Sequence, residues 1–114
     1  MDLHPHLQGP AYLQIDAADK SALTKSVDIL DTVGIYGVEI SKRATTLVAA
    51  CRGITELVEI ASWYKVKTVH RQATNTLRRF QKAIQSLALD ERRGMDIPAK
   101  QRTVSRTLRA VQSI

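Results

Sequence analysis

Acidic residues are missing from one long stretch of this chain. Between Lys65 and Leu89 there is no Asp and no Glu. Residues 65–114 hold twelve Lys or Arg and three acids, a net charge of +9, whereas residues 1–64 hold five bases and eight acids, a net charge of −3. The positive charge is therefore concentrated in one half of the chain, where it raises a local potential that attracts polyanions.

Aromatic residues, Gly and Pro are also scarce. Aromatics make up 4% of the 114 residues, with five Gly and three Pro, while apolar residues make up 44% and charged residues 25%. These values are typical of a folded chain with an aliphatic core, and they favour helices over a turn-rich β-sandwich. No run of apolar residues is long enough to span a membrane. We expect an all-α fold of three to four helices.

Cysteine occurs once, at Cys51. A single cysteine excludes an internal disulfide and is typical of a reducing compartment. The segment Met1–Pro5 lacks the cationic and apolar regions of a secretory signal. We therefore expect a cytoplasmic protein in which Cys51 is a buried core residue.

Two long segments carry apolar residues at helical spacing. Residues 1–15 resemble an irregular arm, and residues 16–114 are predicted to form one helical domain, with a first helix from Asp16 and a break near Gly34 and Gly37. The second helix is predicted from the seam Ile40, Ala44, Leu47, Cys51, Ile54, Val58 and Ala61. The third is predicted from Val66, Val69, Ala73, Phe80, Ala83 and Leu87, with Leu77 and Ile84 on the same side.

These two long helices are expected to fold back as an antiparallel hairpin that frames the domain, because each seam can then bury the other. Such seams also suit self-association into a dimer. Trp63 and Tyr64 lie in the bend beside Lys65 and Lys67. Aromatic side chains next to Lys or Arg can stack on an unpaired nucleobase. Large aromatic side chains more often pack in the core, so we expect both to pack over the bend.

The end of the chain carries its own helix signals. Gly94 is predicted to end the third helix, with Arg92 and Arg93 in the last turn, where cations complement the helix dipole. Asp96 and Pro98 then mark the start of a fourth helix. Its inner face is expected to hold Val104, Leu108 and Val111.

One face of the third helix is polar and basic. At about 100° per residue it lies opposite the apolar face, and from position 67 to position 82 it extends roughly 22 Å. This basic stripe consists of Lys67, Arg71, Asn75, Arg78 and Lys82. An exposed helix face is often simply solvated, but such faces usually mix charge signs, whereas like charges four residues apart repel. The stripe is therefore predicted to hold phosphates.

The fourth helix carries a second set of polar residues. The run from Gly94 to Leu108, with its Thr103-Val104-Ser105-Arg106-Thr107-Leu108 segment, resembles the end of a helix-turn-helix, although its turn is about two residues longer than in many members. The resemblance implies that this helix faces a major groove. The C-terminal contact set consists of Arg102, Thr103, Ser105, Arg106 and, on the same outer side, Arg109.

Groups that carry catalysis or bind a metal are not combined in this sequence. His70 has no carboxylate among its helical neighbours to orient it, and there is no Gly-rich phosphate loop. His4 and His6 fall short of the ligand count of a structural metal site. We expect no enzyme, no cofactor and no metal site.

The leading hypothesis is a non-catalytic nucleic-acid-binding protein, a small regulator or packaging factor for DNA or RNA. The alternative is a helical adaptor, chaperone or inhibitor that docks on an acidic protein. Attachment to an anionic membrane surface suits the basic helix but lacks the large aromatic face expected for it.

Overall fold

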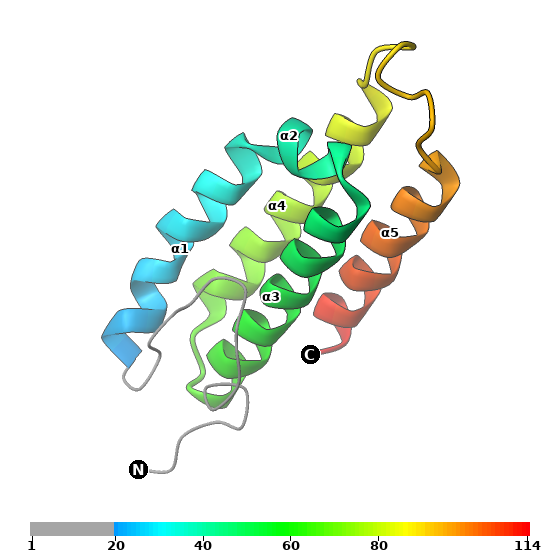
Figure 1. Cartoon of the computed structure of the whole chain (residues 1–114). Helices are drawn as coiled ribbons and strands as arrows, with labels where there is room; N and C mark the ends of the chain where they lie inside the picture. The colour runs from blue at the N-terminus through cyan, green and yellow to red at the C-terminus, as the bar shows by residue number, and fades with distance from the viewer. Residues whose placement is uncertain (1–19) are drawn as a thin grey trace.

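A computed structural model describes residues 20–114, and every regular element in that range is an α-helix (Figure 1). The all-α prediction is thus confirmed for this part of the chain. The predicted arm 1–15, its two histidines and the predicted helix start at Asp16 lie outside the described residues. The five described helices are α1 (Lys20–Ile35), α2 (Gly37–Lys42), α3 (Ala44–Trp63), α4 (Lys67–Gln85) and α5 (Ile97–Ser113).

The described helices exceed the predicted three to four because the predicted second helix is divided. The break expected near Gly34 and Gly37 is present, at Tyr36 between α1 and α2. A further break falls at Arg43, whose backbone is extended, with φ −115° and ψ 123°. The seam from Ile40 to Ala61 is consequently shared by α2 and α3.

The break at Arg43 is stabilised by charged contacts between α2 and distant segments. The Lys100 ammonium donates a 2.7 Å hydrogen bond to the carbonyl oxygen of Ser41, in the last turn of α2. Carbonyl groups at a helix end have no partner within the helix and attract cations. Lys42 forms a 2.9 Å ion pair with Glu91, which joins α2 to the segment after α4. The short helix therefore ends where tertiary contacts satisfy its carbonyl groups.

Helix α4 is the central element of the bundle. It packs against each of the other four described helices, so the α3–α4 pair makes up only part of the frame (Figure 1). The buried face of α4 consists of Val69, Ala73, Thr76, Leu77, Phe80, Ala83 and Ile84. The apolar seam predicted for the third helix is confirmed as buried except for Val66, which is half-buried.

The seam of α3 is used inside the chain. Leu47, Cys51, Ile54, Val58 and Ala61 are each at most 3% exposed and belong to the core, whereas Ala44 is exposed, contrary to expectation. A seam that is already buried in one chain offers no apolar surface to a second copy. The expectation that this seam associates with a second copy to form a dimer therefore loses its physical reason.

The turn between α3 and α4 is a Schellman motif without glycine. The amide of Val66 donates to the carbonyl of Ala61 at 2.8 Å, and the amide of Lys65 donates to the carbonyl of Ser62 at 3.1 Å. This pair of bonds satisfies the last carbonyl groups of a helix and requires a left-handed residue between them, usually Gly. Here that residue is Lys65, with φ 61°.

The two aromatic residues at this turn lie in different environments. Tyr64 is partly buried and packs against the hydrophobic core, as expected. Trp63 is 59% exposed, so the expectation that it packs over the bend is wrong. Consecutive residues at the end of a helix point about 100° apart, and only one of the two can face the core.

The connection from α4 to α5 differs from the prediction. Helix α4 ends at Gln85, nine residues before Gly94, so the prediction that Gly94 ends this helix is wrong. The Arg92 guanidinium folds back and donates to the carbonyl of Leu87 at 2.9 Å and to that of Gln85. It therefore complements the end of α4, but from the loop and not from the helix. Gly94 instead occupies a left-handed turn position, with φ 74°.

The predicted start of the last helix is confirmed. The Asp96 carboxylate accepts a 3.0 Å hydrogen bond from the amide of Ala99, and Pro98 lies in the first turn of α5. The eleven residues 86–96 nevertheless separate α4 from α5, which run antiparallel along each other (Figure 1). A helix-turn-helix joins its helices by a turn of about three or four residues. The resemblance therefore does not extend to the arrangement of these helices.

Candidate nucleic-acid interface

The basic stripe follows directly from the amphipathic character of α4. Its apolar residues are buried against the other helices, which leaves the opposite side of α4 in solvent. Lys67, Arg71, Asn75, Arg78 and Lys82 are all exposed. The five predicted stripe residues thus lie together on one helix face.

The stripe carries positive charge that no other side chain in the described part of the chain neutralises. Helix α4 contains no acidic residue. Within residues 26–114, the ion pairs join Lys42 to Glu39, Lys42 to Glu91 and Arg79 to Asp31, and none involves a stripe residue. The cations at positions 67, 71, 78 and 82 therefore face solvent without a partner among the described side chains.

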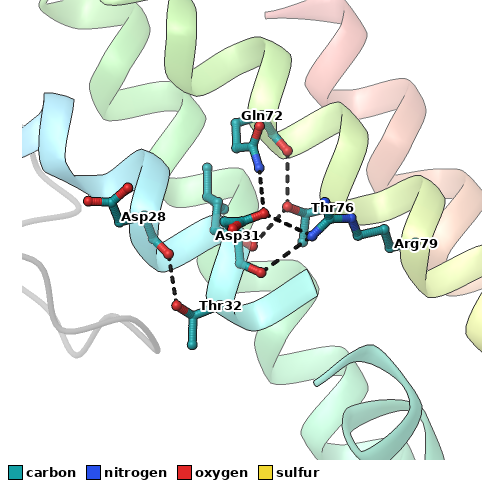
Figure 2. Close-up of polar contacts among 7 residues, drawn as sticks. Asp28, Asp31, Thr32, Gln72, Thr76 and Arg79 are labelled. Carbon is teal, nitrogen blue, oxygen red and sulfur yellow. Dashed lines mark hydrogen bonds and ion pairs between the residues drawn. The ribbon is translucent and has the colours of Figure 1, made fainter. Parts of the chain in front are cut away.

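Arg79, next to the stripe, has a different role. Its Nη1 donates to Asp31 Oδ1 of α1 at 2.9 Å, and the Gln72 amide approaches the same oxygen at 3.5 Å (Figure 2). The aliphatic part of Arg79 also lies over Gly34, where an added Cβ would come within 2.9 Å of Arg79 Cδ. One of the six basic residues in the acid-free segment is thus paired with a carboxylate of α1.

The same contact between α1 and α4 contains a buried hydroxyl. Thr76 is fully buried, and its Oγ1 lies 3.0 Å from the carbonyl oxygens of Leu30 in α1 and Gln72 in α4 (Figure 2). A hydroxyl between two helices restricts how they slide along each other, because a shift leaves a buried polar group unpaired. Thr76 and Arg79 together fix the helix that flanks the stripe.

The C-terminal contact set does not form a comparable surface. Arg102, Arg106 and Arg109 are exposed, whereas Thr103 and Ser105 are half-buried. The Thr103 hydroxyl is engaged, since it donates to the carbonyl of Ala99 at 3.0 Å. Of the predicted residues on α5, only the three arginines are exposed.

Two residues of the C-terminal contact set share a groove with acidic residues. Arg106 and Thr103 line a groove of about 550 Å³ between α3 and α5, together with Glu56 and Glu59 of α3. Carboxylates beside a guanidinium lower the local potential that a phosphate experiences. The ten predicted residues therefore divide into an acid-free stripe on α4 and a mixed-charge face on α5.

A pocket that the sequence did not reveal lies at one end of the stripe, where the α3–α4 turn meets Ile114, the residue that follows α5. Its volume is about 510 Å³. It is lined by Val58, Ser62, Lys65, Val66, Lys67, His70, Arg71 and Ile114. Two of these residues, Lys67 and Arg71, belong to the stripe as well. The only signal in the sequence was that the acid-free segment begins at Lys65.

Titratable groups elsewhere in the core serve the fold. Burial raises the pKa of the Cys51 thiol from 9.0 to about 11, although a hydrogen bond with Thr107 acts in the opposite direction. Cys51 is 3% exposed, as predicted. Burial also lowers the pKa of Lys100. Within the described range, no three His, Cys, Asp or Glu side chains gather where they would hold a metal ion.

Comparison with known proteins adds nothing to this geometry. No protein-family model matches the chain, and no curated protein or solved structure is significantly similar to it. Among the helices that the structure describes, none combines the length and the apolar character needed to cross a membrane.

Proposed function

We propose that this protein binds nucleic acid without catalysis and holds phosphate groups with the basic stripe. The observation that supports this proposal is that Lys67, Arg71, Arg78 and Lys82 are exposed and unpaired among the described side chains. Like charges at four-residue spacing cost a few tenths of a kcal/mol per pair, and nothing on α4 offsets that cost. An external polyanion relieves this repulsion.

The stripe would act mainly by releasing counterions from the nucleic acid. Each phosphate neutralised by Lys or Arg releases condensed cations, which makes binding depend on salt. Contacts of this kind fix the position of a protein on the strand but do not read its sequence. Asn75, between Arg71 and Arg78, adds a neutral donor for a phosphate or a base edge. We therefore expect weak sequence preference, as in a packaging factor or a small regulator.

The arginines of α5 would add a secondary contact. Arg102 and Arg109 are exposed, and they lie outside the groove that Arg106 shares with Glu56 and Glu59. Base reading by Thr103 and Ser105 requires these half-buried side chains to turn toward solvent. The contribution of α5 to affinity is consequently expected to be smaller than that of the stripe.

The test is the salt dependence of binding, measured by fluorescence anisotropy of a labelled oligonucleotide between about 50 and about 200 mM salt. Replacing Lys67, Arg71, Arg78 and Lys82 by Gln should lower the slope of log K against log salt by about 3, because each phosphate contact contributes ~0.7 to ~0.9. An unchanged slope contradicts the proposal.

A matched pair of variants separates the stripe from net charge. Arg71→Gln with Arg78→Gln removes two charges from the stripe, and Arg43→Gln with Arg93→Gln removes two exposed charges elsewhere. The first pair should lower the slope by about 1.4 to 1.8, and the second should leave it nearly unchanged. Equal effects of the two pairs indicate that general charge, and not the stripe, attracts the nucleic acid.

A second candidate function is docking on an acidic protein. It is favoured by apolar side chains at the α1–α2 junction, where Ile35 is 69%, Tyr36 59% and Val38 40% exposed. Clustered apolar exposure of this kind is typical of protein contacts. This candidate predicts one stoichiometric partner on purification from the native cell and little retention on heparin. A homodimer through the same residues would be seen as a doubled mass in sedimentation.

A further inference from the structure

The pocket at the end of the stripe has the size and the chemistry of a ligand site. Its volume of about 510 Å³ lies within the range of small-molecule pockets. The apolar residues of its lining, which we call the floor, are Val58, Val66 and Ile114, from α3, the turn and the end of the described chain. Val58 is only 1% exposed, so Val66 and Ile114 supply most of this apolar surface. An apolar floor accepts a flat, weakly polar group and removes it from water.

The charged residues of the lining, which we call the rim, are cationic. They are Lys65, Lys67 and Arg71, and no Asp or Glu of the described chain lines the pocket. The combination of an apolar floor and three basic side chains is suited to an anion that also carries an apolar or aromatic group. Because Lys67 and Arg71 also belong to the basic stripe, a polyanion that lies along α4 reaches the pocket without a gap.

The backbone at the rim adds to this preference. Helix α4 begins beside the pocket, and Val66 at its N-cap position supplies no side-chain hydrogen bond. The first turn of α4 contains no acidic residue. Free amide groups at a helix start favour negative charge. Lys65 itself is in the left-handed conformation, with φ 61°, at a position where Gly is usual, so a charged side chain stands here at a conformational cost.

We propose that this pocket binds one unpaired nucleotide of a single-stranded nucleic acid. The base packs against Val66 and Ile114, and the adjoining phosphate contacts Lys65, Lys67 and Arg71. A base within a duplex is stacked and paired and cannot enter without being extruded. The protein therefore prefers single strands and unpaired ends to a blunt duplex. This inference rests on the proposed function and specifies its substrate.

The experiment compares three labelled oligonucleotides of about 12 nucleotides, a length that covers a single-strand binding site. One is a single strand, one is a duplex with an unpaired end, and one is a blunt duplex; each is made as DNA and as RNA. The pocket variant is Ser62→Glu, which places a carboxylate on an exposed wall residue. The control is Thr45→Glu, an exposed position at the other end of α3 with the same change in charge.

For the unmodified protein, we expect the single strand and the duplex with an unpaired end to bind about tenfold more tightly than the blunt duplex. Ser62→Glu should weaken binding of these two ligands about tenfold. For the blunt duplex, Ser62→Glu and Thr45→Glu should have the same affinity. The salt slope of the blunt duplex should not change, because the stripe is intact.

Other outcomes overturn the inference in distinguishable ways. If all three ligands bind equally and Ser62→Glu behaves as Thr45→Glu does, the pocket takes no nucleotide while the stripe still binds phosphates. If Ser62→Glu weakens all three equally, the effect is one of charge and the pocket is again excluded. If no oligonucleotide binds with a salt-dependent affinity, the proposed function fails together with the inference.

Discussion

Replacing Lys65 by Gly is expected to stabilise the protein. Lys65 has φ 61°, and it lies between two hydrogen bonds of 3.1 and 2.8 Å that hold it in a left-handed conformation. The Lys65 side chain is exposed, and it forms no hydrogen bond or ion pair with another described residue that would offset this geometry. A residue with a Cβ pays roughly 1 to 2 kcal/mol in this conformation, whereas Gly does not.

The net gain is smaller than the strain, because Gly also gives the unfolded chain more freedom. We expect Lys65→Gly to raise the free energy of unfolding by about 1 kcal/mol. For a domain of this size, that corresponds to an increase in Tm of about 4 °C or more. Thermal unfolding followed by far-UV circular dichroism measures it. High salt removes the contribution of the lost charge.

Two further variants at the same position serve as controls. Lys65→Asn should lie between Lys and Gly in stability, because Asn tolerates the left-handed region better than most residues. Lys65→Ala loses the charge but keeps the Cβ, so it should not be more stable than the unmodified protein. If Lys65→Gly is no more stable than Lys65→Ala, this residue is not left-handed in solution and the reasoning is refuted.

Two more predictions concern buried groups in the core. Lys100→Met should lower the free energy of unfolding by about 2 kcal/mol, measured with urea, because it leaves the buried carbonyl of Ser41 without its 2.7 Å partner. Lys42→Met breaks only surface ion pairs and should lower it by less than about 1 kcal/mol. An equal loss of stability in the two variants contradicts the role assigned to Lys100. Cys51 should make stability depend on alkaline pH: since its pKa is raised from 9.0 to about 11 in the folded protein, the stabilisation is complete below pH 9.0 and is lost as pH rises through about 11. The loss relative to Cys51→Ala should reach about 2 to 3 kcal/mol, and parallel stability curves for the two proteins contradict it.

The stripe was predictable because it depends only on local periodicity. A helix of 3.6 residues per turn places every third or fourth residue on one side, so the apolar residues of α4 determine where its bases lie. Phe80 and Leu77 are fully buried and Arg78 is exposed, as their spacing requires. The N-terminal boundary of α5 was predictable for a related reason, since Asp96 acts on an amide three residues away.

Helix ends that depend on distant residues were not predictable. The segment from Ile40 to Ala61 has an unbroken helical pattern, yet the chain is extended at Arg43, where Lys100 reaches the carbonyl of Ser41 from 59 residues away. Helix α4 ends at Gln85 because Arg92 and the loop supply partners for its last carbonyl groups. Propensity along the chain does not contain these contacts.

The amino-acid sequence by itself determined that the described chain is helical and that α4 has an acid-free basic face, because both are properties of spacing within one segment. The tertiary structure decided which bases remain free: it pairs Arg79 with Asp31, 48 residues earlier, and sets Arg106 beside Glu56 and Glu59. It also created the pocket, by bringing Ile114 to the turn that carries Lys65. Charge pairing and cavities depend on which segments meet in space, and a periodic pattern does not specify that.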